Sequence, residues 1–237
     1  EDPAGDRPTH FAAIAQLTKE MAADKIQALL LIGGNPAYDA PTDVDFPGAL
    51  ARVPLSIHLA LYDDETSRLC KWHLPRAHYL ESWGDARSWD GTVGLVQPLI
   101  EPLFGGKSTI ELLAMLSGDS ATAGDEIVRR TWKDQFIKGG DFELGYKKAL
   151  EAGVLPNSAS PAVTAPVTIT KFPDDPASAG GSVFLKFEPD PHTFDGRYAN
   201  NGWLQETPKP LTKLVWDNAA LISVKDARAW GDLKTGD

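Results

Sequence analysis

One stretch of the chain combines a buried strand with a turn that could bind a ligand. Residues 28–32 are an uninterrupted aliphatic run, and Gly33, Gly34, Asn35 and Pro36 follow it directly. This pattern predicts a buried strand that ends in a tight turn. In α/β sheets, ligands bind just beyond the carboxyl ends of the strands. The turn is therefore a candidate binding site, although glycine also permits a plain chain reversal because it adopts positive φ at little cost.

A second stretch, FGGKST at residues 104–109, resembles the end of a phosphate-binding loop. Such a loop needs a further glycine five residues before Gly106, and Glu101 occupies that position. Helix capping explains the same residues better, because Ser108 can cap a helix while Glu111, three positions later, completes a capping box. We therefore expect the start of a helix here rather than a nucleotide site.

Three residues with soft-metal chemistry lie close together in the sequence. They are Cys70, His73 and His78. Zinc in proteins takes four ligands, or three ligands and a water molecule, in a tetrahedral arrangement. No fourth ligand is evident in the sequence. The alternative is a buried thiol with two histidines that satisfy hydrogen bonds near the end of a sheet.

Acid and base groups follow the second predicted strand. His58 lies within this strand, and the acidic residues 63–65 end it. Carboxylates at the end of a strand could act in acid–base catalysis. They could equally cap the next helix, and the spacing of Asp64 and Ser67 favours a cap. The sequence has no glycine-flanked nucleophile elbow.

Composition excludes several classes of function. The chain has 237 residues, with 33 acidic and 23 basic side chains and a net charge of −10, so it would repel the backbone of a nucleic acid. No segment approaches the ~20 apolar residues that a membrane-spanning helix needs. The single cysteine excludes an internal disulfide and an iron–sulfur cluster held by this chain alone. The opening EDPAGDRP has no initiator methionine, and we expect a piece of a longer protein.

Helical and strand patterns alternate along the first part of the chain. This alternation predicts an α/β fold with a largely parallel sheet that helices cover on both faces. The expected elements are helices over 9–23 and 44–52, strands over 28–32 and 53–61, a helix–strand unit over 65–81, a strand over 91–97, and helices over 108–117, 124–138 and 141–152.

The composition changes at Gly153. The residues that follow it are rich in proline, serine and alanine and have no periodic apolar face, which is typical of a linker. Beyond the linker, the patterns favour short strands and turns. We therefore expect an α/β domain over 1–153, a linker over 154–166 and a β-rich segment over 167–237.

Several short motifs, taken in order over nearly the whole chain, resemble the molybdopterin oxidoreductase superfamily. In that family a strand ends in a Gly-x-Asn-Pro turn that lies against a pterin–guanine dinucleotide, and Gly33 to Pro36 match this turn. The pairs Glu65-Thr66, Leu74-Pro75 and Leu80-Glu81 match later family motifs, as does the Gly-x-Val-Gln at 94–97. The resemblance implies a three-layer domain with a parallel sheet, followed by a small, incomplete β-rich lobe.

Departures from the family pattern point to a variant without the cofactor. Family members that bind it have Ala-Asp-Val-Val-Leu-Pro and Asn-Thr-Glu-Gly-Arg where this chain has CKWHLP and SWDGTVG. Trp72, Trp83 and Trp89 are bulky where a dinucleotide needs room. The chain is most similar to the large iron–sulfur subunit of bacterial alternative complex III, in which the molybdopterin fold is a scaffold that lacks the cofactor.

This resemblance implies a scaffold within a quinol-oxidising, electron-transferring oxidoreductase complex on the periplasmic side of the bacterial inner membrane. The partners would be the other subunits, with neither nucleic acid nor direct membrane insertion. Iron–sulfur clusters would lie elsewhere in the full-length subunit, and this piece would have no catalytic residue and no metal ligand. The vestigial cofactor site would consist of Gly33, Gly34, Asn35, Pro36, Glu65 and Thr66.

Two alternatives remain open. One is a working domain of a molybdenum oxidoreductase that binds molybdopterin guanine dinucleotide. The other is a free-standing α/β protein that binds a small anion at Gly33 to Asn35. In the family, the stretch that matches the carboxyl end of this chain opens a β-barrel. This implies a strand over 219–223 and a short helix over 225–230, with Trp203 and Trp216 buried as anchors.

Overall fold

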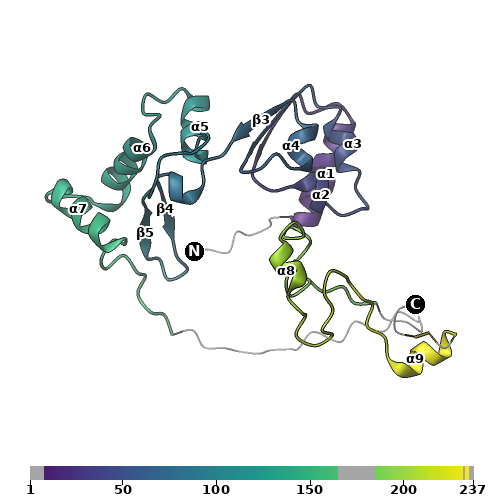
Figure 1. Cartoon of the computed structure of the whole chain (residues 1–237). Helices are drawn as coiled ribbons and strands as arrows, with labels where there is room; N and C mark the ends of the chain where they lie inside the picture. The colour runs from purple at the N-terminus through teal and green to yellow at the C-terminus, as the bar shows by residue number, and fades with distance from the viewer. Residues whose placement is uncertain (1–7, 165–184, 232, 235–237) are drawn as a thin grey trace. The chain divides into compact units, whose positions relative to one another are not determined.

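The first helix and the first two strands form within one or two residues of the bounds that the apolar patterns predict. The computed structural model describes residues 8–164, 185–231 and 233–234 of the chain. These residues belong to two units, 1–172 and 173–237. Figure 1 labels the helices and strands along the chain.

The first unit contains a parallel sheet built from the aliphatic runs. Its strands are β1 (Ala28–Ile32), β2 (Leu55–Ala60) and β3 (Trp72–Pro75), in the order β1-β2-β3. The register places Leu30 opposite Ile57, and Leu59 opposite Leu74. The expected alternation of helix and strand is thus confirmed in this part of the chain.

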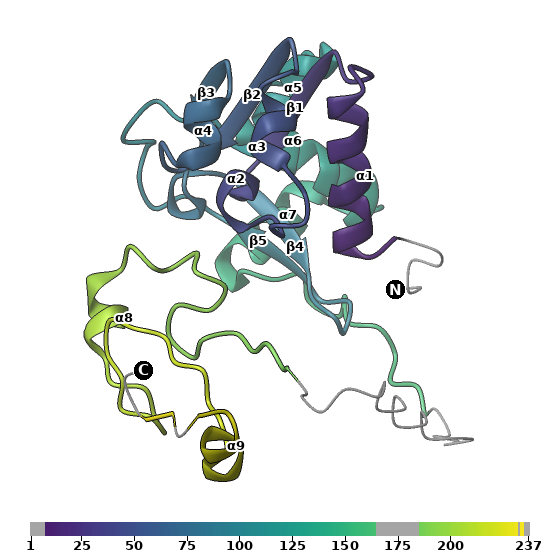
Figure 2. The ribbon, with the colours of Figure 1, turned by 90° about the vertical axis from the view of Figure 1, so that its right-hand side faces the viewer.

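One face of this sheet packs against two helices, α1 (His10–Ala22) and α3 (Phe46–Leu50), which Figure 2 shows in front of the strands. Leu29 and Leu31 lie against the core between the sheet and these helices. The buried residues of this core are Met21, Phe46, Ala49, Leu50 and Val53.

The opposite face of the sheet is covered only in part. Leu59 on this face is fully buried, whereas Ile32 is 39% exposed, Leu55 is 40% exposed and Trp72 is 62% exposed. The prediction that helices cover both faces of the sheet therefore holds only in part. An apolar residue that packs against another element and an apolar residue that stays exposed have the same sequence pattern, so the pattern does not show which faces are covered.

Two short helices begin directly after the first two strands. They are α2 (Pro36–Asp39), which follows β1, and α4 (Glu65–Leu69), which follows β2. Because β1 and β2 are parallel, their carboxyl ends meet at one edge of the sheet and bring the starts of α2 and α4 together. All the residues of the predicted vestigial site lie at this edge.

The rest of the first unit departs from the predicted parallel arrangement. β4 (Gly84–Arg87) and β5 (Val93–Val96) form an antiparallel hairpin, which the sequence does not predict. A short 3₁₀ helix, η1 (Tyr79–Glu81), precedes it. The helices that follow are α5 (Thr109–Ser117), α6 (Gly124–Thr131), which continues as the π-helical η2 (Trp132–Phe136), and α7 (Phe142–Ala152).

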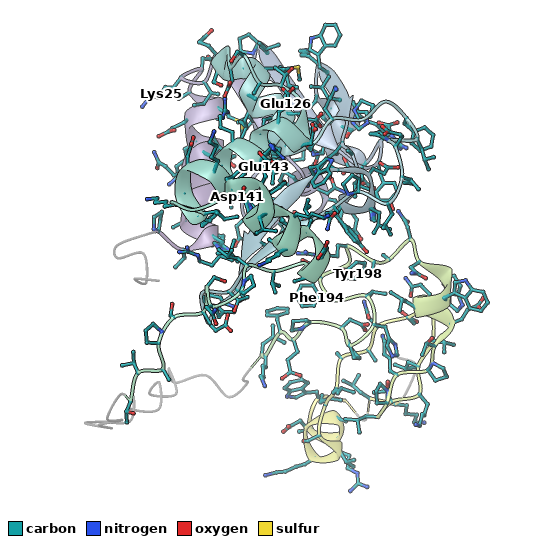
Figure 3. The ribbon with its side chains drawn as sticks, turned by 90° about the vertical axis from the view of Figure 1, so that its left-hand side faces the viewer. Lys25, Glu126, Asp141, Glu143, Phe194 and Tyr198 are labelled. Atoms are coloured by element: carbon teal, nitrogen blue, oxygen red, sulfur yellow. The ribbon has the colours of Figure 1, made fainter. Side chains whose placement is uncertain are left out.

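A second core holds the hairpin to these helices. Trp132 is fully buried in it, and its indole nitrogen donates to Asp85 of β4 at 3.0 Å. Arg129 of α6 forms an ion pair with Glu143 of α7, and Figure 3 labels Glu143 on the exposed side of α7. The buried residues of this core are Val93, Val128, Trp132, Tyr146 and Ala149.

The start of the predicted linker is attached to the first unit. Leu155 N donates to Val93 O at 2.8 Å, and Ser160 N donates to Asp90 O at 2.6 Å. The first unit therefore extends past the predicted boundary at 153. These backbone contacts come from the hairpin, and a composition pattern does not report them.

The described part of the second unit has little regular structure. It contains α8 (Gly202–Glu206) and α9 (Val224–Ala229), and Asp190 and Phe194 form an isolated antiparallel bridge. The short helix expected near the carboxyl end is confirmed by α9. The expected strand over 219–223 is wrong, because these residues form no ladder. Residues 165–184, where β-rich structure was also expected, lie outside the described residues.

The second unit buries no residue among those that the structure describes. Trp203 is 83% exposed and Trp216 is 60% exposed, so neither is a buried anchor. The β-rich description of this segment is therefore wrong for residues 185–231. A salt bridge between Lys209 and Asp190, 2.8 Å apart, is the least exposed contact between charged groups in it.

Across the described ranges, no helix is both long enough and apolar enough to cross a membrane.

Candidate functional site

The turn after β1 follows the predicted glycine conformation. Gly33 has φ of 65° and Gly34 has φ of 72°, a region that glycine adopts without steric cost. Gly33 N donates to Leu59 O of β2 at 2.8 Å, so the turn continues the sheet by one residue. Asn35 and Pro36 then start α2, with proline in the first turn, where its missing N–H costs nothing.

Asn35 links this turn to the start of α4. Its amide nitrogen donates to the Glu65 carboxylate at 2.7 Å. Its amide oxygen accepts from the Thr66 hydroxyl at 2.7 Å and from Thr66 N at 3.2 Å. The Thr66 hydroxyl in turn accepts from Ala37 N at 3.0 Å. The structure thus brings together Asn35, Glu65 and Thr66, which the sequence singles out only by resemblance.

These contacts leave a negative charge beside the turn. The hydrogen bond from Asn35 is the largest cause that lowers the pKa of Glu65, so Glu65 is a carboxylate at neutral pH. Asp64 precedes it and accepts from Ser67 N at 2.8 Å, which confirms the predicted helix cap. An anion that approached the turn from this side would meet two carboxylates.

A cation lies next to Gly33 of the turn. A Cβ atom added to Gly33 would be 2.9 Å from the guanidinium of Arg76, which follows β3 at the same edge of the sheet. Within the described residues, Arg76 has no hydrogen-bond or ion-pair partner through its side chain. The motifs in the sequence do not single out Arg76, although its place directly after a parallel strand is a signal for a site residue.

A buried polar cluster lies beneath the start of α4. The Ser67 hydroxyl is 2.8 Å from His58 Nδ1 and 2.9 Å from His73 Nδ1, and it donates to Tyr62 O at 3.2 Å. A hydroxyl has one hydrogen, so when it donates to Tyr62 both imidazoles donate to its oxygen. The cluster therefore ties β2, β3 and α4 together.

This cluster is not arranged as a nucleophilic triad. Asp64 Oδ1 lies 3.6 Å from His58 Nδ1, the nitrogen that also faces Ser67. A serine–histidine–aspartate relay needs the serine and the carboxylate on different ring nitrogens. His58 Nε2 is buried and has no partner among the described residues. The predicted alternative of acid–base catalysis at the end of β2 therefore gains no support from the geometry.

The three candidate metal ligands have separate surroundings. Cys70 packs against the first core, and burial raises the pKa of its thiol. His73 faces Ser67. His78 caps η1 by accepting from Leu80 N at 3.3 Å. Within the described ranges, no group of three or more histidine, cysteine or acidic residues is placed to hold a metal ion.

The candidate phosphate-binding stretch is a helix start, as predicted. The Ser108 hydroxyl accepts from Glu111 N at 3.3 Å, and Ser108 N donates to the Glu111 carboxylate at 2.8 Å. Both halves of the capping box are therefore present at the start of α5. Lys107 lies 3.6 Å from Glu111, so the residue that completes the capping box also faces the lysine.

The three tryptophans do not gather at the turn after β1. Trp72 opens β3 opposite Ile57, so it lies level with Leu30 of β1, three residues before Gly33. Trp83 packs against the second core, and Trp89 is 98% exposed between β4 and β5. These side chains therefore form no single cluster, and the expectation that they take up the room of a dinucleotide stays a prediction. The closure of the turn comes from Asn35, Glu65 and Thr66 instead.

Comparison of the chain with models of protein families and with curated proteins finds no match.

Proposed function

We propose that this chain is a non-catalytic scaffold within a molybdopterin-oxidoreductase-like subunit of a quinol-oxidising electron-transfer complex, and that it holds no pterin cofactor. The motifs that resemble the superfamily carry the first part of this proposal. The complex would lie on the periplasmic side of a bacterial inner membrane, with its other subunits as the partners of this chain. Iron–sulfur clusters would belong to other segments of the full-length subunit.

The absence of a bound pterin in this proposal is supported by the hydrogen bonds that Asn35 makes within the chain. Both polar atoms of the Asn35 amide are bound within the chain, to Glu65 and to Thr66. A ligand that took these hydrogen bonds would leave Thr66, which is fully buried, without its partner. An unpaired buried polar group costs about 1–3 kcal/mol. The Glu65 carboxylate would also repel the diphosphate of a dinucleotide.

One observation favours the alternative function, a working site for molybdopterin guanine dinucleotide. Gly33 and Gly34 leave the backbone of the turn free of side chains, and the Arg76 guanidinium lies over Gly33. Arginine binds phosphate groups through its planar fork of donors. The same geometry would suit a small anion, as in the other alternative, a free-standing α/β protein that binds an anion at Gly33 to Asn35.

Metal and pterin content distinguish these functions. The full-length protein that contains this chain, purified from its native membranes, should contain no molybdenum by elemental analysis and should release no fluorescent pterin on oxidation. The preparation should also oxidise a quinol, because the complex retains its other subunits.

A content near one molybdenum atom per chain would overturn the scaffold proposal and support the alternative. In that case Arg76→Ala should lower the pterin content, while Arg68→Ala, a matched change at an exposed arginine on α4, should leave it unchanged. A preparation that lacks both molybdenum and quinol oxidation would contradict the proposed complex.

A further inference from the structure

An apolar loop follows β5 and extends into solvent. It spans residues 98–104 and is named the 98–104 loop. Leu99 is 77% exposed, Leu103 is 70% exposed and Phe104 is 85% exposed. Tyr79 of η1, beside the loop, is 65% exposed. Large apolar side chains that gather on one surface are typical of an interaction site, whereas single exposed ones are common.

Backbone hydrogen bonds hold this loop in place. Leu99 N donates to Leu80 O at 2.7 Å, and Leu103 N donates to the Glu81 carboxylate at 3.3 Å. Just after the loop, Lys107 N donates to Pro75 O at 3.0 Å. A Cβ atom on Gly106 would be 2.9 Å from Ala77 N, so the backbones are in close contact. The exposed side chains are thus presented by an ordered segment, which lowers the entropy cost of binding.

One charged residue lies within the apolar sequence of the loop. Glu101 is exposed and has no hydrogen-bond or ion-pair partner in the part of the chain that the structure describes. It lines a hollow of about 370 Å³ whose other charged residues are Glu81, Lys107 and Glu111. Lys107 lies 3.6 Å from Glu111, and among the described residues it forms no ion pair with Glu101. The loop therefore offers apolar contacts around an unpaired negative charge.

We propose that the 98–104 loop is a docking surface for another protein, whose contacting segment is apolar and supplies a lysine or arginine to Glu101. The charge decides among the possible occupants. A second copy of this chain carries a net charge of −10 of the same sign as Glu101, and an anionic membrane surface would repel Glu101. The identity of the docked protein as a subunit of the same complex rests on the proposed function. The existence of the docking surface does not rest on the proposed function.

Site-specific crosslinking tests this surface. The photoreactive residue p-benzoylphenylalanine replaces Phe104 in the full-length protein in its native cells, and the same residue replaces Val163 as a control. Val163 is 85% exposed and lies outside the loop. We expect Phe104→p-benzoylphenylalanine to give an adduct with a different polypeptide, at a segment where lysine or arginine is flanked by apolar residues. The control should not give this adduct.

Charge reversal provides the second readout. Glu101→Lys in the Phe104 crosslinking variant should lower the yield of the adduct by about tenfold or more, because like charges would meet in the contact. Glu101→Gln should have a smaller effect. The melting temperature of both should match that of the unsubstituted protein, because Glu101 is exposed and has no internal partner.

An adduct with a second copy, an adduct with lipid, or no adduct above the Val163 control would overturn the proposal. A yield that Glu101→Lys leaves unchanged would overturn it too. The outcome is separable from the molybdenum analysis: a preparation with molybdenum that still gives the predicted adduct refutes the scaffold role and supports the docking surface.

Discussion

At the scale of single residues, Asn35 determines how much of the turn after β1 is available to a ligand. Its amide donates to Glu65 and accepts from Thr66, so one side chain joins the ends of two parallel strands. Hydrogen bonds to a charged acceptor are stronger than those between neutral groups. Asn35 and Glu65 therefore stabilise each other most when the carboxylate is ionised.

The first prediction at this scale concerns Glu65 and pH. The pKa of Glu65 in the folded state lies below its ordinary value of 4.5. The bond to Asn35 therefore stabilises the fold at pH values above about 4.5, and this stabilisation is lost as the pH falls through the folded-state pKa. Glu65→Gln keeps the acceptor and removes the charge. Its deficit in the free energy of unfolding, measured by urea denaturation, should shrink between pH 6 and about pH 3.

Glu151→Gln is the control for this experiment, because Glu151 is an exposed residue near the end of α7. Its free energy of unfolding should differ little from that of the unsubstituted protein across the same pH range. A deficit of Glu65→Gln that stays constant or grows toward acid pH would show that the Asn35–Glu65 bond does not depend on the charge.

At the scale of elements, side-chain caps define where the helices begin. Asp64 caps α4, Ser108 caps α5 and Asp141 caps α7, and each accepts from a backbone N–H of the first turn. These N–H groups have no partner inside the helix, so the cap satisfies them. At α5 the capping box also explains the Gly-Lys-Ser sequence, which would otherwise suggest a phosphate site.

A pair of variants at α5 separates the two explanations. Ser108→Ala should destabilise the protein by about 1 kcal/mol, because the cap is lost. Lys107→Ala should cost less than about 0.5 kcal/mol, because an exposed pair with Glu111 contributes little. Both values come from urea denaturation. If ATP raised the melting temperature of the unsubstituted protein and either variant abolished that rise, the loop would be a nucleotide site instead.

At the scale of the whole molecule, the two units differ in how much they bury. The first unit has two apolar cores, around Phe46 and around Trp132. The described part of the second unit has no buried residue, and Figure 3 labels Phe194 and Tyr198 on its irregular backbone. A segment that buries little apolar surface gains little to offset the entropy lost on ordering.

Hydrogen exchange should reflect this difference. In the intact chain, backbone amides between residues 185 and 231 should exchange about tenfold or more faster than those of β2, because local opening costs less where few groups are buried. Mass spectrometry of peptides from a time course measures this. The helix α6 is an internal reference, since it carries Val128 into the second core. Equal protection in both units would contradict the expectation.

Local structure in this protein follows from the sequence. The strand over 28–32 was predicted with its observed bounds, and the helix over 9–23 differs from α1 by one residue at each end. The caps at Asp64 and Ser108 were also predicted. These features depend on neighbours within a few positions along the chain, so their residue types and spacing are sufficient.

Tertiary structure decided the features that join distant segments. Arg76 reaches Gly33 only because β1 and β3 flank β2 in one parallel sheet, and the two histidines meet Ser67 for the same reason. β4 and β5 pair as an antiparallel hairpin. The pattern of apolar residues in this region is equally compatible with a single strand, so it does not predict the pairing. Tertiary structure also decides which side chains are buried, since Trp132 is fully buried and Trp89 is almost fully exposed. A side chain's surroundings are set by elements far from it in sequence, so residue type alone does not determine them.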